Sequence, residues 1–193
     1  MRKEKIKMAK IGLTNFWYSL LTEASDGTPS YAGAKNPGKA VSFNFEPTNS
    51  NATLYADDAL AESDYATTGG NVTLGIDRED PETFAELLGH TYTDGEVVRN
   101  TDDTAPYVGI AHVVTLMVDN VRKYKAEILN KVKLSEPTEE ANTRGESTEF
   151  GTYELAGTAT TLGNGNWSQY KYFDTKAEAV AYIKQVLGAS ESE

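Results

Sequence analysis

The side chains of this chain that are best suited to proton transfer are two histidines, His90 and His112. His112 stands within an apolar stretch rich in Val and Ile, which is typical of a structural histidine in or beside a sheet. His90 follows Gly89 at the expected end of a helix, where a cation interacts favourably with the helix C-terminus. We therefore interpret both histidines as structural.

Groups of carboxylates could bind a cation or act as an acid–base pair, since calcium takes oxygen ligands and glycosidases use two carboxyl groups. The groups are Asp57-Asp58 with Asp64, Asp77 with Glu79 and Asp80, and Asp102-Asp103. None has the spacing of an EF-hand loop, and neighbouring residues of a strand point to opposite faces. The absence of cysteine excludes disulfides and thiolate metal sites. We predict solvated loop carboxylates, no metal, no cofactor and no enzymatic activity.

The charge balance is strongly acidic. The 29 Asp and Glu residues against 18 Lys and Arg give a formal net charge of −11 over 193 residues. Such a chain lacks the cations that displace counterions from nucleic acid, so we expect no grip on DNA. No stretch approaches the ~20 apolar residues of a membrane span, and no apolar run follows the basic residues 2–7 as in a signal peptide. The length suits one domain, made and kept in the cytosol unless lysis releases it.

Alternating hydrophobicity predicts a chain made mainly of strands. The expected strands are residues 11–21, 41–45, 53–56, 72–76, 105–118, 121–134, 148–162 and 167–173. Turns are expected at Asp119-Asn120 and, as a strong hairpin signal, at residues 163–166.

Helix signals appear twice. A short helix should begin after Asp80 and end at Gly89. The second should begin at Asp174 and end before Gly188. Its predicted buried residues are Ala177, Val180 and Ala181, together with either Ile183 and Leu187 or the stem of Lys184.

These elements predict a mainly β (α+β) fold, an antiparallel β-sandwich or barrel with a short flanking helix, a C-terminal helix and long exposed loops. Polar, breaker-rich composition marks residues 44–70 and 135–147 as projecting loops. The expected organisation is a flexible basic arm (1–8), a β domain (9–173), a C-terminal helix (174–188) and a disordered tail (189–193).

Several segments, in order, resemble the phage major tail protein family of long-tailed phages that infect Gram-positive bacteria (the phi13-type major tail proteins). They are residues 11–22 (IGLTNFWYSLLT), 52–58 (ATLYADD), 72–76 (VTLGI), 87–90 (LLGH), 103–109 (DTAPYVG), 134–140 (LSEPTEE) and 148–152 (TEFGT). The resemblance covers roughly residues 9–173 and rests on the ordered set, not on any single segment. The basic start and the second helix are not part of it.

The resemblance implies a tail-tube protein of the virion, synthesised and assembled in the host cytoplasm. Hexameric rings of the chain would stack into a tube that holds a tape measure protein, ends at tail tip and tail terminator proteins, and lets DNA pass without specific binding. No membrane is involved. The expected assembly contacts are Leu54, Tyr55, Asp57, Asp58, Glu136, Glu139 and Glu140.

Other interpretations stay open at this point. The same fold could form the tube of a phage-tail-like particle or of a secretion system. A β-sandwich adhesion or carbohydrate-binding module is a further alternative, although a secretion signal is absent. A hydrolase ranks lower, because no base, nucleophile and orienting group can be assembled from the sequence.

Overall fold

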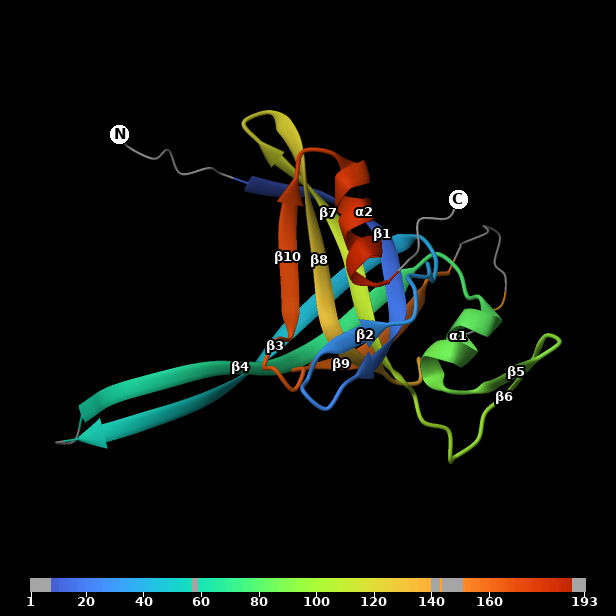
Figure 1. Cartoon of the computed structure of the whole chain (residues 1–193), viewed down its shortest axis with the longest axis horizontal. Helices are drawn as coiled ribbons and strands as arrows, with labels where there is room; N and C mark the ends of the chain where they lie inside the picture. Colours follow the sequence, from blue (N-terminus) through green and yellow to red (C-terminus); the bar gives the residue numbers. More distant parts are fainter. Residues whose placement is uncertain (1–7, 57–58, 140–142, 144–150, 189–193) are drawn as a thin grey trace.

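The protein is built on one eight-stranded antiparallel sheet that is folded on itself (Figure 1). The computed structural model describes residues 8–56, 59–139, 143 and 151–188. The strand order is β2-β1-β7-β8-β9-β4-β3, and β10 pairs with β8 beside this path. The elements of the sheet are β1 (Met8–Glu23), β2 (Pro29–Tyr31), β3 (Ala40–Ala56), β4 (Ala59–Ile76), β7 (Tyr107–Val118), β8 (Val121–Leu134), β9 (Tyr153–Thr160) and β10 (Ser168–Phe173). The predicted mainly β, antiparallel fold with two helices is confirmed.

The middle of the sheet is apolar on both faces because it serves two cores. In β7, Val108 and Ile110 point to one side, while Ala111 and Val113 point to the other. The first side forms the sheet core, where the two halves of the folded sheet meet. Its fully buried members include Phe16, Ile76, Val108, Val132 and Leu155.

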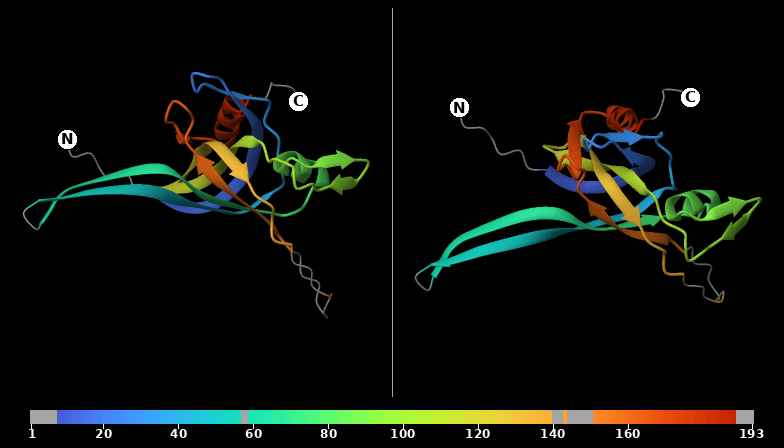
Figure 2. Two further views of the ribbon diagram at one scale, coloured as in Figure 1. Left: turned by 90° about the horizontal axis from the view of Figure 1, so that it is seen from below. Right: turned by 60° about the horizontal axis from the view of Figure 1, so that its bottom comes forward.

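The second side forms the helix core, under α2 (Lys176–Val186). Ala111, Val113, Ala126 and Ile128 of the sheet meet Ala179, Ile183 and Leu187 of the helix. Small alanines on both surfaces let the helix backbone approach the sheet closely. Figure 2 shows α2 lying on the side of the sheet away from β3 and β4.

Helix α2 begins at Lys176, two residues later than predicted, and ends before Gly188 as predicted. Thr175 is its N-cap and forms a capping box with Glu178. The prediction that Ala177 and Ala181 are buried was wrong, because both are exposed. The alternative with Ile183 and Leu187 is confirmed, since these two side chains are fully buried.

Helix α1 (Pro81–Leu88) begins and ends as predicted. The Asp80 side chain accepts a hydrogen bond from the Thr83 N–H, and Gly89 ends the helix with a left-handed φ of 81°. Its apolar residues Phe84, Leu87 and Leu88 complete the sheet core. The short hairpin of β5 (Thr91–Thr93) and β6 (Glu96–Val98) follows, and we call α1 with this hairpin the α1 lobe.

Of the two predicted turns, one joins a hairpin and the other does not. Asp119 and Asn120 both have positive φ, as a two-residue turn between β7 and β8 requires. Residues 163–166 do turn, since the Leu162 N–H donates to the Asn166 carbonyl. However, β9 and β10 do not pair with each other. Strand β10 pairs with residues 124–129 of β8, and β9 pairs with residues 132–134, so the sheet divides along β8 between these two stretches.

Candidate assembly surfaces

A two-stranded arm leaves the body of the protein where β3 and β4 continue past the sheet core (Figures 1 and 2). We define this projecting arm as residues 47–56 and 59–69. Residues 44–70 project as predicted, and the predicted strand at 53–56 is the end of β3. The prediction of a loop for the rest is wrong, because the two strands stay paired from Pro47 opposite Gly70 to Ala56 opposite Ala59. At about 3.3 Å per residue, the arm extends roughly 30 Å from the body.

The arm forms strands in spite of its breakers because of where these residues lie. Pro47 lacks an N–H, but β3 is the edge strand of the sheet, where one side of the ladder needs no donor. Side-chain hydrogen bonds tie the base of the arm together. Thr67 Oγ1 donates to Asn49 Oδ1 at 2.8 Å, and Ser50 Oγ donates to the Ala66 carbonyl at 3.3 Å.

Two of the predicted assembly contacts, Leu54 and Tyr55, belong to the arm. Leu54 is opposite Glu62, and Tyr55 is opposite Leu60. Asp57 and Asp58 lie outside the described residues. The structure therefore places the backbone of Leu54 and Tyr55 near the far end of the arm, remote from both cores.

Two further predicted contacts, Glu136 and Glu139, lie beside the α1 lobe, which Figure 2 shows on the side of the body away from the arm. Glu139 forms an ion pair with Arg99 at 2.5 Å, and Glu136 approaches His90 Nε2 at 2.5 Å. Glu140 lies outside the described residues. The four predicted contacts that the structure describes thus form two separate groups, and Glu136 and Glu139 are engaged within their own chain.

His90 is the centre of this second group. Its side chain is only 5% exposed, and its Nδ1 lies 2.7 Å from Asp103 Oδ2. The Nε2 atom has no well-aligned hydrogen bond, although Glu136 Oε1 is close. His90 therefore joins the end of α1 to two other segments through carboxylates, whereas the sequence suggested only an interaction with the helix terminus.

Three carboxylates of the remaining groups form hydrogen bonds within the chain. Asp80 caps α1, Asp103 binds His90, and Asp77 Oδ1 accepts a hydrogen bond from the Lys39 N–H at 2.7 Å. Within the described residues, no three His, Asp or Glu side chains gather as a metal site. In the same part of the chain, no helix has both the length and the apolar character needed to span a membrane.

The structure adds a surface that the sequence did not single out, the outer edge of β10. This strand pairs only with β8 among the described strands, so its other edge is open. Tyr170 and Tyr172 are exposed here and meet edge to face, and Lys125 Nζ lies 4.4 Å from the Tyr170 ring centre. The alternation of Tyr170 and Tyr172 in sequence was the available signal.

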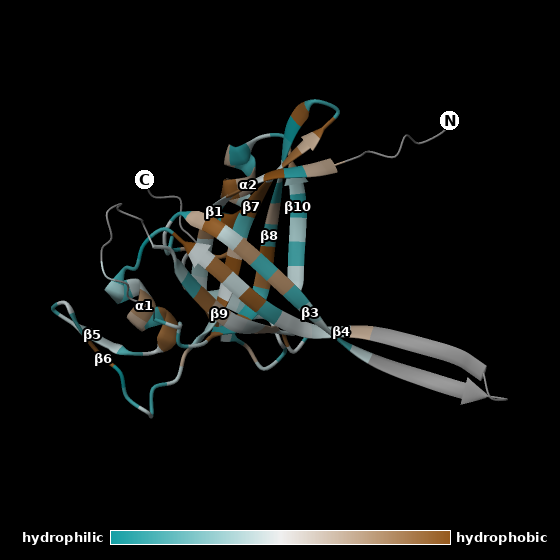
Figure 3. Cartoon of the chain, turned by 180° about the vertical axis from the view of Figure 1, so that it is seen from behind, coloured by the Kyte–Doolittle hydropathy of each residue, from teal (hydrophilic) through white to brown (hydrophobic). Residues whose placement is uncertain are grey.

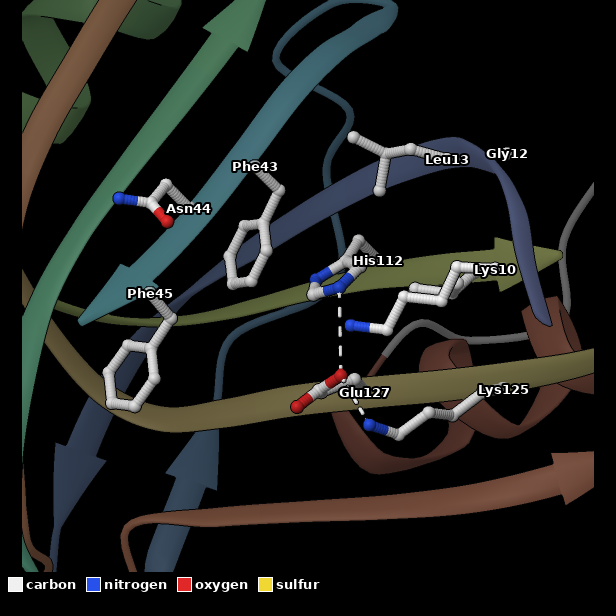
Figure 4. A pocket seen from close by; sticks show the side chains of 10 residues that line it. Lys10, Gly12, Leu13, Phe43, Asn44, Phe45, His112, Lys125 and Glu127 are labelled. Atoms are coloured by element: carbon white, nitrogen blue, oxygen red, sulfur yellow. Dashed lines mark hydrogen bonds and ion pairs between the residues drawn. The ribbon is translucent and has the colours of Figure 1, made fainter. Parts of the chain in front are cut away.

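A pocket of about 440 Å³ opens at the end of the sheet core, next to the base of the arm (Figure 4). Phe43 and Phe45 of β3 form one wall, and Lys125 and Glu127 of β8 form another. His112 lies between them and is 2% exposed; its ring centre is 3.9 Å from that of Phe43, with the two rings tilted by 37°.

Burial lowers the pKa of His112 to about 4, and the charges of Lys125 and Lys10 act in the same direction against Glu127. His112 is therefore neutral at neutral pH. This agrees with the interpretation of His112 as a structural histidine of the sheet.

Among the described residues, the surfaces open to contact include the arm, the edges of β3 and β10, and the polar outer face of β3, β4 and β9. No protein-family model matches the chain, and no curated protein matches it.

Proposed function

We propose that this protein is the building block of a phage tail tube, in which hexameric rings stack into a channel for DNA. The observation that carries the proposal is the projecting arm on a β body with open strand edges. The ordered segments that resemble phage major tail proteins support it from the sequence side. In the virion, the tube would enclose a tape measure protein and end at the tail tip and the tail terminator.

The arm suits contact between subunits. A two-stranded hairpin alone is marginally stable in water, so an arm that extends roughly 30 Å gains stability by lying on another molecule. Its far end carries Leu54 and Tyr55, which a neighbouring subunit in the same ring or in the next ring would contact.

Open edges suit the closure of a ring. The β3 edge and the β10 edge each offer backbone donors and acceptors that another strand can pair with. If each of six subunits gave four strands, the wall would hold about 24 strands at ~4.8 Å spacing, a perimeter of ~115 Å. The backbone diameter is then roughly 37 Å before strand tilt, which leaves room for a DNA duplex.

Electron microscopy of the purified protein tests the proposal. Negative-stain images at increasing protein concentration should show rings or tubes. Monodisperse monomers at every concentration would refute it.

Two variants locate the contact. Tyr55→Asp should leave a folded monomer that no longer forms tubes, because it places a charge in an interface. Replacing residues 50–66 by Asn-Gly should have the same effect, since it removes the far part of the arm and closes the remaining strands with a favoured turn. Tubes of normal length from either variant would refute the contact role of the arm.

A further inference from the structure

The outer face of the β3-β4-β9 half of the sheet carries mainly short polar side chains. Its residues form three cross-strand rows: Glu46, Asn71 and Thr158; Asn44, Thr73 and Ala156; and Ser42, Gly75 and Glu154. We call these nine residues the polar face. Most are exposed, and their inward-pointing neighbours, such as Leu74 and Leu155, belong to the sheet core. Figure 3 shows the three strands side by side.

The polar face carries two glutamates and no lysine, arginine or aromatic residue. One carboxylate oxygen of Glu46 accepts a hydrogen bond from Asn44 Nδ2 at 3.3 Å. The next residue along the Glu46 row is Lys133 of β8, which is half-buried and covers the Tyr107 ring. Lys39 and Arg78 stand just beyond the ends of β3 and β4.

The cations and aromatic side chains of the other half of the sheet make a contrast. Lys125 of β8 lies over the Tyr170 ring of β10, beside Tyr172, while Lys171 lies over Phe173 and Tyr182 on the other face of β10. Lysines release counterions from phosphates and aromatic rings stack on bases, so these side chains are the types that attach to nucleic acid, although Lys123 and Lys125 are paired with Asp174 and Glu127. The polar face has neither means of attachment.

Short side chains make the polar face low in relief as well. Ser, Thr, Asn, Ala and Gly side chains hold water without projecting far from the strands, and the two carboxylates repel phosphate. A duplex moving along this face would meet a hydrated, weakly repelling wall instead of a series of binding sites.

We infer that the polar face is the surface that lines the channel, turned towards a duplex polyanion that must slide past without binding. This inference rests on the proposed tube function and assigns one face of the fold to the lumen. It also places the arm, which continues from β3 and β4, in the wall of the tube and not on its outer surface.

Single cysteines test the assignment, because the natural chain contains none. Asn71→Cys lies on the polar face, and Gln185→Cys, on the exposed side of α2, is the matched control. Each variant is assembled into tubes, treated with a maleimide-linked gold cluster and imaged by electron microscopy. Gold should lie along the tube axis for Asn71→Cys and outside the wall for Gln185→Cys.

Several outcomes overturn the assignment. Gold outside the wall for Asn71→Cys would place the polar face on the exterior. A cysteine that reacts in the monomer but not in the tube would place the face in an interface between subunits. Thr158→Cys, directly opposite Asn71, replaces the first variant if that one does not assemble. If neither assembles while Gln185→Cys does, the face is again a subunit contact.

Failure of the proposed function looks different. If the unmodified protein forms no tubes, the tube proposal is wrong and the lumen assignment falls with it. If tubes form and only the gold is misplaced, the tube proposal stands and the lumen assignment alone is wrong.

Discussion

His90 Nδ1 lies 2.7 Å from Asp103 Oδ2, and the same carboxylate oxygen accepts the Asn100 N–H at 2.8 Å. The Asp103 side chain thus fixes the end of α1 to the segment that leads into β7. The backbone N–H of Asn100 and then His90 hold the pKa of Asp103 below its usual range.

Asp103→Ala should destabilise the protein, because the two donors lose their shared acceptor. We expect the Tm to fall by about 2–4 °C, the shift for a chain of this length when one hydrogen bond's worth of stability is lost. Differential scanning calorimetry at neutral pH measures it. The neighbouring Asp102→Ala, at an exposed position, should leave the Tm unchanged; equal shifts in the two variants would contradict this role of Asp103.

Stability should depend on pH through His112. The folded pKa, about 4, lies below the unfolded value of about 6.5, so His112 contributes stability that is complete above pH 6.5. That contribution is lost as pH falls from about 6.5 to 4, at up to about 1.4 kcal/mol per pH unit. His112→Gln should show a flatter dependence across this window in urea denaturation. If His112→Gln and the unmodified protein lose stability with the same slope, the pKa of His112 is the same in the folded and unfolded protein, and burial does not lower it.

Only the face of α2 that packs on the sheet should contribute to the free energy of unfolding. Ile183 is fully buried in the helix core, so Ile183→Ala should lower the free energy of unfolding by about 2–5 kcal/mol. Ala181, two residues earlier, is exposed, so Ala181→Ser should change the free energy of unfolding by less than about 0.5 kcal/mol. Chemical denaturation of both variants decides whether α2 is integral to the fold. A small effect of Ile183→Ala would show that the helix is loosely attached.

Gly69, at the base of the arm, should not tolerate a side chain. Its φ is 148°, and a Cβ there would approach the Ala159 carbonyl oxygen to 2.2 Å. Gly69→Ala should therefore destabilise the protein by more than about 1 kcal/mol, while Gly151→Ala, where a Cβ meets nothing within 4 Å, should not. Urea denaturation compares the two variants, and an equal effect would show that the base of the arm can shift to make room.

The body of the fold could be predicted because local signals and tertiary packing agree there. Phe16, Trp17 and Tyr18 read as a strand that is apolar on both faces, and both faces are indeed covered, by the sheet core and the helix core. The cap of α1 at Asp80 and its end at Gly89 are local chemistry, which the sequence carries in full.

The arm could not be predicted because its base, at residues 47–50 and 66–68, is exposed and imposes no alternation of buried and exposed side chains. Residues such as Asn49 and Ser50 have low strand propensity, and their pairing with β4 comes from the register that β3 inherits from the body. The pairing of β9 and β10 with different stretches of β8 is also determined by tertiary contacts between residues far apart in sequence. The turn at residues 163–166 was visible in sequence, but which strand each flank joins was not.

The two cores on either side of β7 make its alignment unusually hard to mistake. A slip of β7 by one residue would carry Val108, Ile110 and His112 under α2 and would bring Ala111 and Val113 into the sheet core. Both sides would then be filled wrongly at once, one overpacked and the other hollow. Misaligned forms are therefore penalised twice, so the body can hold one pairing firmly while its open edges remain available to other chains.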